Sequence, residues 1–309
     1  MSNLKEFYFL SASEKNNIRT RCYTPDDGAV KATVQIAHGI AEHCERYDAF
    51  CNFLADNGFA VYINDHLGHG KSVTGEGIKG YFAPKDGWMK VVSDMHTIYG
   101  ISEEEYPDVK HFLFGHSMGS FLARTYLFTY PQDFSGAVIC GTSHMSRTVI
   151  AAGKTMASVS AAINPTKVDK ALEGVAFGSY NNSFKPIRTK YDWLTRVESV
   201  VDAYIADPMC GFTCTSRLYA DMMSGLMMIT DTKNIAKMDK DTPVFFISGS
   251  MDPVGENGEG VKRAYAFFLT SGMKDVQMKL YDGARHELLN ETNKEDVMHD
   301  VLNWLIEKI

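Results

Sequence analysis

The stretch HFLFGHSMG, residues 111–119, decides the fold. It contains the short apolar run Phe112–Phe114 (FLF), so we expect a buried strand at His111–Phe114, and apolar residues with helical spacing follow it. A serine in G-x-S-x-G between a strand and a helix is typical of a nucleophile elbow, which projects the Ser117 hydroxyl from a tight turn. Gly115 and Gly119 fit this turn because larger side chains would collide with neighbouring backbone.

The start of the expected helix adds a second chemical feature. The backbone N–H of Met118 would lie at the helix N-terminus, where partial positive charge stabilises an oxyanion. A purely structural glycine-rich turn is the alternative. The strand before the motif and the helix after it favour the elbow.

A serine hydroxyl is a weak nucleophile and needs a base, which in turn needs an orienting acid. With this elbow the chain order is serine, acid, histidine. Asp252 follows the strand expected at Pro243–Ser248 (PVFFIS), and His286 follows the strand expected at Val276–Tyr281 (VQMKLY). Because parallel strands present functional groups at their carboxyl ends, we expect these side chains to meet Ser117.

Two other residues compete for these roles. Asp282 is a rival acid, but it lies only four residues before His286, whereas Asp252 has its own strand end. His299 is the other histidine after the middle segment, and we expect it to lie on the surface or to pack within the final helix, Lys294–Lys308. We therefore favour Ser117, Asp252 and His286.

The remaining chain alternates strand and helix patterns, which predicts an α/β fold with a mostly parallel sheet flanked by helices. Further buried strands are expected at Thr33–Ala37, Ala60–Asn64 and Gly136–Cys140, and helices at Arg46–Asp56, Met89–Glu104 and Ser117–Thr129.

The alternation stops in the middle of the chain. Residues 144–238 show amphipathic helical pieces and no clear buried strand, and so long a loop without its own structure is uncommon. We predict an α/β core formed by residues 1–143 and 239–309, with a helical cap inserted at 144–238.

Two groups of residues are expected around the serine. The turn that begins at His38-Gly39 follows a strand and can bring the Ile40 amide toward the serine as a second oxyanion donor, with His38 bracing the loop. Met222, Met223 and Leu226 have helical spacing in the cap. They can form a flexible apolar wall for an acyl chain or simply pack on the core.

A metal site is an alternative function for the histidines and carboxylates near the strand ends. Potential ligands cluster near two strand ends, but they lack H-E-x-x-H or another recognised ligand spacing, and histidines bracing loops are the simpler explanation. Cys210 and Cys214 have zinc-like spacing without a second pair. We expect neither metal nor cofactor. The clustered residues are His38, Glu42, His43, Asp65, His66 and His69.

Composition limits the partners and the location. The 309 residues carry a net charge of −7 and are 45% hydrophobic, which is ordinary for a globular protein. The acidic balance and the absence of basic runs argue against nucleic-acid binding. No stretch has the length of a membrane span or a secretion signal, so we expect a cytoplasmic protein whose six cysteines are free thiols.

Several motifs together resemble the α/β-hydrolases. The chain is most similar to the monoacylglycerol lipase and lysophospholipase branch, whose members are also described as serine aminopeptidases. The resemblance implies an eight-stranded core, a helical lid and ester hydrolysis without cofactor. It also implies a triad of Ser117, Asp252 and His286 with Ile40 and Met118 as oxyanion donors. The motifs are HGIAEH (38–43), DHLGHGKS (65–72), GHSMG (115–119), SGSMDP (248–253), YDGARHE (281–287) and VESVVDAYIADPMCGF (197–212).

The expected activity is therefore hydrolysis of a carboxylic ester with an acyl chain, with monoacylglycerols or lysophospholipids as substrates. Transient contact of the cap with a membrane surface is a further expectation, and the sequence predicts no oligomeric state. A catalytically silent binding protein is one alternative. The other is a proline-iminopeptidase-like aminopeptidase, which would need an acidic cap residue to hold the substrate amine. Candidates are Glu173, Asp192, Glu198 and Asp202.

Overall fold

The computed structural model describes residues 2–75 and 77–309. One eight-stranded sheet with the order β1-β2-β4-β3-β5-β6-β7-β8 runs through the molecule. β2 pairs antiparallel with β1 and with β4, and all other neighbours are parallel. The strands are β1 Asn3–Leu10, β2 Asn17–Thr24, β3 Ala32–Ala37, β4 Phe59–Asn64, β5 Lys110–His116, β6 Gly136–Cys140, β7 Val244–Gly249 and β8 Val276–Tyr281.

The six parallel strands are those predicted from the buried apolar runs. The residue pattern did not indicate β1 and β2, which only the family resemblance implied. β1 is an edge strand with mostly exposed side chains. β2 buries Arg19 and Arg21, which pair with carboxylates, so it contains no apolar run, and the short apolar patch of β1 lies largely exposed.

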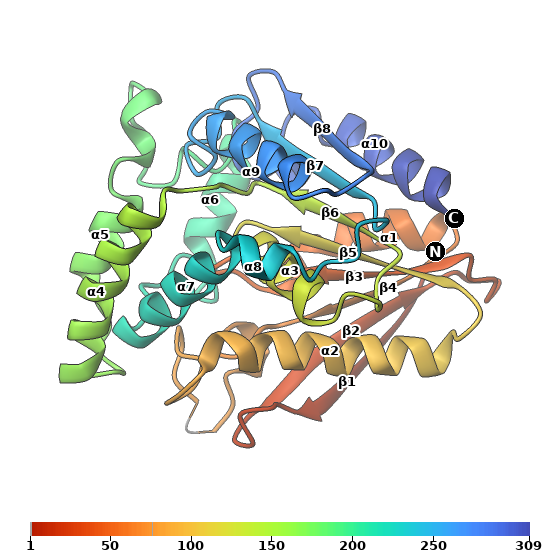
Figure 1. Ribbon diagram of the computed structural model, residues 1–309, viewed down its shortest axis with the longest axis horizontal. Helices are drawn as coiled ribbons and strands as arrows, with labels where there is room; N and C mark the ends of the chain where they lie inside the picture. The colour runs from red at the N-terminus through yellow and green to blue at the C-terminus, as the bar shows by residue number, and fades with distance from the viewer. Residues whose placement is uncertain (1, 76) are drawn as a thin grey trace.

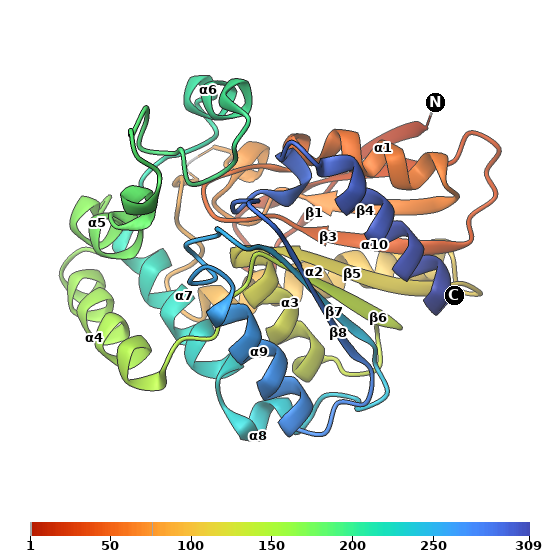
Figure 2. The same ribbon diagram turned by 90° about the horizontal axis from the view of Figure 1, so that it is seen from above.

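Helices cover both faces of the sheet (Figure 2). α1 and α10 share an apolar core with one face, and α2, α3 and α9 pack on the other. The α-helices are α1 Asp48–Asp56, α2 Gly87–Glu105, α3 Met118–Thr129, α4 Arg147–Ile163, α5 Lys170–Phe177, α6 Glu198–Ala206, α7 Ser216–Ile229, α8 Thr232–Ile235, α9 Glu259–Thr270 and α10 Lys294–Lys308; the short 3-10 helices are η1 Cys44–Tyr47, η2 Gly70–Ser72, η3 Tyr180–Ser183 and η4 Leu288–Asn290.

The helices α4 to α8 all lie between β6 and β7 in the chain, and α4 and α5 form the end of the molecule opposite the termini (Figure 1). α7 packs on α4 and also on α2 and α3 of the core. We propose that residues 144–238, called the cap below, form a separate layer over the carboxyl ends of the strands.

Two further features concern the whole chain. In the part that the structure describes, none of the helices combines the length and the apolar character that a membrane span requires. All six cysteines are buried free thiols, as the sequence predicted.

Candidate active site

Ser117 lies between β5 and α3 in a strained backbone conformation, with φ 53° and ψ −120°. Such a conformation costs a non-glycine residue about 1–3 kcal/mol. A Cβ atom on Gly115 would lie 2.4 Å from the Gly119 carbonyl oxygen, and one on Gly119 would lie 2.0 Å from the Ala37 carbonyl oxygen. The turn therefore requires both glycines, as predicted.

Asp252 and His286 meet although 34 positions separate them in the chain. Asp252 follows β7, His286 follows β8, and His286 Nδ1 lies 2.9 Å from Asp252 Oδ2. Ser248 and the backbone N–H of Val254 donate further hydrogen bonds to the same carboxylate at 3.2 and 2.9 Å. A carboxylate facing Nδ1 holds the proton on that nitrogen, so Nε2 is left as the basic atom.

The surroundings of His286 set its protonation. Burial lowers the pKa of the ring, but the charge and hydrogen bond of Asp252 outweigh burial, and the net pKa is raised above 6.5. The rings of His116 and Trp193 lie against it at centroid distances of 4.7 and 5.1 Å. The imidazole is thus held in one orientation, and its charged form is stabilised.

Ser117 and His286 line the same cavity. No hydrogen bond joins the Ser117 hydroxyl to the His286 ring among the residues that the structure describes. In serine enzymes without bound substrate this bond is often long and shortens only when the substrate binds. The arrangement is therefore compatible with proton transfer from Ser117 to His286.

The two rival residues lie elsewhere. Asp282 accepts a hydrogen bond from the Ser250 hydroxyl at 3.4 Å, and Asp252 occupies the position beside His286. His299 is exposed on α10, with its ring 5.1 Å from that of Phe53. The geometry favours Asp252 and His286 over these two residues.

The turn formed by residues 38–43, which we call the oxyanion turn, lies directly against the serine. A Cβ atom on Gly39 would lie 3.2 Å from the Cβ of Ser117. Ile40 lines the cavity beside the serine, and Met118 is the first residue of α3, so its N–H has no acceptor within the helix. Both proposed oxyanion donors are therefore adjacent to Ser117.

His38 braces this turn. Its Nε2 accepts a hydrogen bond from the His66 N–H at 3.0 Å, so Nδ1 carries the proton and donates to the Gly39 carbonyl oxygen at 2.7 Å. Burial lowers the pKa of the ring and keeps it neutral. The structural role predicted for His38 is confirmed.

A buried ion network, which sequence reasoning missed, connects the oxyanion turn to the loop after β8 that carries His286 and Glu287, called the histidine loop below. The Glu42 carboxylate accepts a hydrogen bond from the Gly39 N–H at 2.5 Å and pairs with Arg46 at 2.6 Å. Arg46 also holds Glu287 through two hydrogen bonds of 2.6 and 2.7 Å. The spacing of Glu42 and Arg46, four residues apart, was the available signal. Glu287, the third member, lies beside His286 in the chain.

The charge state of Glu42 follows from this network. Burial raises the pKa of the carboxyl, but the Arg46 charge and neighbouring histidines outweigh burial and lower it to about 2. The carboxylate therefore remains charged at neutral pH and holds the Gly39 N–H.

A cavity of about 470 Å³ opens over the serine between the cap and the core. This volume is within the usual range for small-molecule sites, and its wall is largely aromatic and aliphatic. The apolar and aromatic residues that the cap contributes include Phe177, Ile187, Tyr191, Trp193, Leu194, Tyr204, Phe212 and Tyr219.

The three residues expected to form an apolar wall do not line this cavity. Met222 and Leu226 are buried in the main core, and Met223 lies against Gly153 of α4. This face of α7 packs on neighbouring helices, and Tyr219 is the residue of α7 that reaches the cavity. These three residues therefore pack on the core and on neighbouring helices, which was the alternative to an acyl-chain wall.

Among the acids named for an aminopeptidase, Glu173 lines the cavity, where its carboxylate accepts a hydrogen bond from the Thr213 hydroxyl at 2.9 Å. Asp192 is held by the hydroxyl and backbone N–H of Thr189. Glu198 and Asp202 pair with Arg188 on the outside of the cap.

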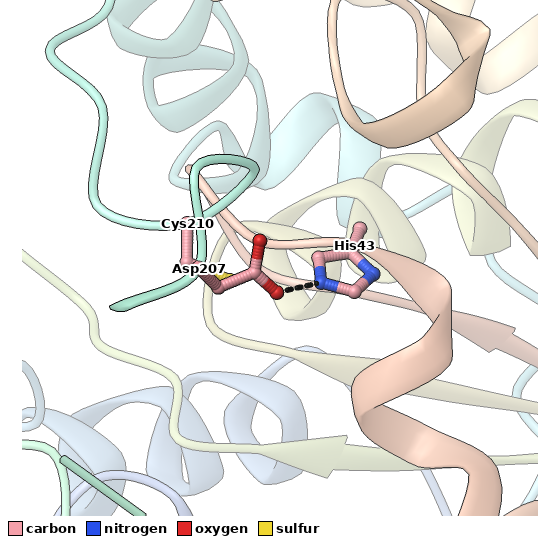
Figure 3. Close-up of side chains that lie close together, drawn as sticks. All are labelled: His43, Asp207 and Cys210. Carbon is pink, nitrogen blue, oxygen red and sulfur yellow. Dashed lines mark hydrogen bonds and ion pairs between the residues drawn. The ribbon is translucent and has the colours of Figure 1, made fainter. Parts of the chain in front are cut away.

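The residues weighed as metal ligands have other contacts. The rings of His66 and His69 pack around His38 at centroid distances of 4.1 and 5.3 Å. Within residues 2–75 and 77–309, the one trio with ligand spacing is His43, Asp207 and Cys210 (Figure 3). There Asp207 binds His43, and burial raises the pKa of the Cys210 thiol and keeps it protonated.

Comparison with known proteins gives the family of this chain. The family model described as serine aminopeptidase, S33, matches residues 28–293. The chain belongs to this family. It is similar to the monoglyceride lipase of Mus musculus, with 28% identity over 298 residues that cover 93% of this chain and 86% of the relative. It is also similar to the monoacylglycerol lipase of Mycolicibacterium smegmatis, with 27% identity over 292 residues that cover 92% and 91%.

A solved structure gives the same result for the fold of this S33 member. The thermostable carboxyl esterase from Bacillus coagulans, solved in complex with glycerol, superposes with a TM-score of 0.90 and 29% identity over 99% of both chains. The predicted α/β-hydrolase fold and the resemblance to its monoacylglycerol lipase branch are therefore confirmed.

Proposed function

We propose that this protein is a serine hydrolase that cleaves carboxylic esters, with monoacylglycerols as its substrates. The observation that carries the proposal is the contact of His286 with Asp252 at the edge of an apolar cavity that also contains Ser117. The relatives named for monoacylglycerol hydrolysis and the esterase of the same fold support the substrate class.

The proposed mechanism uses the chain's own groups. His286 Nε2 takes the Ser117 proton as the oxygen attacks the ester carbonyl, and Asp252 holds the imidazole and stabilises the imidazolium. The Ile40 and Met118 N–H groups stabilise the oxyanion. Collapse of the intermediate transfers the proton from His286 to the departing alcohol, and water then releases the acid from the acyl-enzyme.

The decisive test is Ser117→Ala, assayed with monoacylglycerols of graded chain length, lysophospholipids and amino-acyl amides. We expect wild type to prefer monoacylglycerols, and the variant to lose about 10³-fold or more in kcat. Equal melting temperatures would show that the loss is chemical. Wild-type esterase activity in the variant would contradict the role of Ser117, and a preference for amino-acyl amides would contradict the substrate class.

Substrates of this kind partition into lipid, and the cap has a surface suited to lipid. Along α4 the exposed apolar side chains include Val149, Val159 and Ile163, which are 54%, 58% and 82% exposed. Val175 of α5 is 67% exposed, and α5 lies beside α4 in both views (Figures 1 and 2). We propose that this face contacts a membrane surface transiently.

We also propose a cytoplasmic location. The six free thiols support this proposal, because thiols stay reduced in a reducing compartment such as the cytoplasm.

A further inference from the structure

The cap holds the oxyanion turn at a strained residue. Ala41 has a positive φ of 54°, which is unfavourable for a residue with a side chain. Its carbonyl oxygen accepts two hydrogen bonds from the cap, one from the Gly211 N–H at 2.9 Å and one from the Tyr204 hydroxyl at 3.1 Å. These bonds help to maintain a conformation that the isolated turn would leave.

A second contact lies two residues further along the turn. His43 Nε2 lies 2.8 Å from the Asp207 carboxylate, which projects from the loop after α6 (Figure 3). Asp207 is itself fixed by the Met209 N–H at 2.7 Å. The His43 side chain is 5% exposed and that of Asp207 is 28% exposed, so the contact is shielded from water mainly on the histidine side.

The cap contacts also meet the ion network of the core. The Arg46 guanidinium lies 4.8 Å from the centre of the Tyr204 ring, and the same guanidinium binds the Glu42 carboxylate. Ile40 therefore sits between two held neighbours. The core holds Gly39 through the Glu42 carboxylate, and the cap holds Ala41 through Tyr204 and Gly211.

We propose that Tyr204 and Asp207 are positioning residues that hold the Ile40 N–H in its oxyanion-binding conformation, so that docking of the cap on the turn sets the rate of the chemical step. This inference rests on the proposed function, because it assumes that Ile40 donates to the oxyanion. It assigns to the cap a part in catalysis besides forming the cavity.

The test uses Tyr204→Phe, which removes only the hydroxyl, and Asp207→Asn, which removes the charge at constant size. Asp202→Asn is the matched control, because Asp202 lies on α6 and pairs with Arg188 within the cap, away from the turn. The substrates are a monoacylglycerol and p-nitrophenyl acetate, whose acyl group is too short to depend on the cap wall. A boronic acid that forms a tetrahedral adduct with the serine measures oxyanion binding directly.

We expect kcat to fall by about tenfold or more in both test variants with both esters, less than the loss on deleting a whole oxyanion donor. The affinity for the boronic acid should fall in parallel, while the KM and the melting temperature of both test variants stay near the wild-type values. The control Asp202→Asn should match wild type in all of these measurements. Amide hydrogen exchange in residues 38–43 should accelerate in both test variants. A merely structural role of the cap would instead raise KM for the monoacylglycerol and leave kcat for the acetate unchanged.

The two levels of the proposal fail differently. If wild type hydrolyses neither ester, or Ser117→Ala is as active as wild type, the proposed function is wrong. If wild type is active, Ser117→Ala is inactive, and the Tyr204 and Asp207 variants retain kcat and boronic acid affinity, this inference alone is wrong.

Discussion

Gly119 is the elbow residue with the least space for a side chain, because the Ala37 carbonyl oxygen lies where its Cβ atom would be. We expect Gly119→Ala to lower the free energy of unfolding by more than about 4 kcal/mol, since rigid backbone must move. Gly100→Ala in α2 is the control, because a Cβ atom there meets nothing within 4 Å, and it should gain about 0.5–1 kcal/mol. Urea unfolding measures both, and near-wild-type stability of Gly119→Ala would contradict the elbow geometry.

The pH dependence of activity belongs to His286. The base must be neutral, so kcat/KM should rise with pH through the His286 pKa, and the charge of Asp252 moves this limb to higher pH than for an unpaired imidazole. In Asp252→Asn the limb should move to lower pH because the charge is gone, and kcat should fall by about 10⁴-fold. A pH profile of both enzymes checks this, and an unmoved limb would assign it to another group.

Among the elements, the network from the oxyanion turn through η1 to the histidine loop depends on Arg46. Arg46→Met would leave Glu42 and Glu287 buried without a counter-charge, at a cost of about 3–5 kcal/mol at pH 7. In wild type the depressed Glu42 pKa stabilises the fold above about pH 4.5, and this stabilisation is lost only as pH falls toward 2.

In Arg46→Met the uncompensated Glu42 carboxyl should instead have a raised pKa, so the deficit relative to wild type should shrink as the pH is lowered. Denaturant unfolding at pH 7 and at about pH 4.5 measures the difference. Arg46→Lys keeps the positive charge but lacks the planar guanidinium that binds two carboxylates, so it should lose less free energy of unfolding than Arg46→Met. A Met variant that is as stable as wild type at pH 7 would show that the network contributes nothing.

The elements also show where sequence reasoning works. Parallel strands buried on both faces are nearly continuous apolar runs, so β3 to β7 could be predicted from the sequence pattern, whereas β8 is only partly buried and its apolar residues alternate with polar ones. The periodicity of α7 correctly indicated an apolar face but could not identify its neighbour, which is why Met222, Met223 and Leu226 were candidates for a cavity that they do not line. Helical spacing predicts which residues share the apolar face of a helix, but it does not predict which element that face packs against.

At the scale of the whole molecule, the exposed apolar face of the cap predicts lipid-dependent activity. Val159→Asp with Ile163→Asp on α4 should reduce binding to phosphatidylcholine vesicles containing monoacylglycerol by about tenfold, equivalent to about 1.4 kcal/mol. Hydrolysis of p-nitrophenyl acetate should be unchanged. Ile306→Asp on α10, at a site 51% exposed, is the control. Unchanged vesicle binding in the α4 variant would remove the proposed membrane contact.

The candidate site was predictable because its three polar side chains each follow a recognisable strand and occur in a fixed order along the chain. The cavity wall was not, because Phe177, Trp193 and Tyr219 come from separate parts of the cap whose relative positions depend on tertiary packing. Likewise Glu287 and Arg46 meet across 241 positions, a contact that no local pattern encodes.

The insertion of the cap between β6 and β7 has a consequence for synthesis on the ribosome. β7 pairs with β6 only after the entire cap has been translated, and β8 joins later still. A nascent chain that has completed α3 thus already carries its nucleophile, but the acid and the base arrive with the last two strands. We therefore expect the emerging polypeptide to stay hydrolytically silent until His286 has left the exit tunnel.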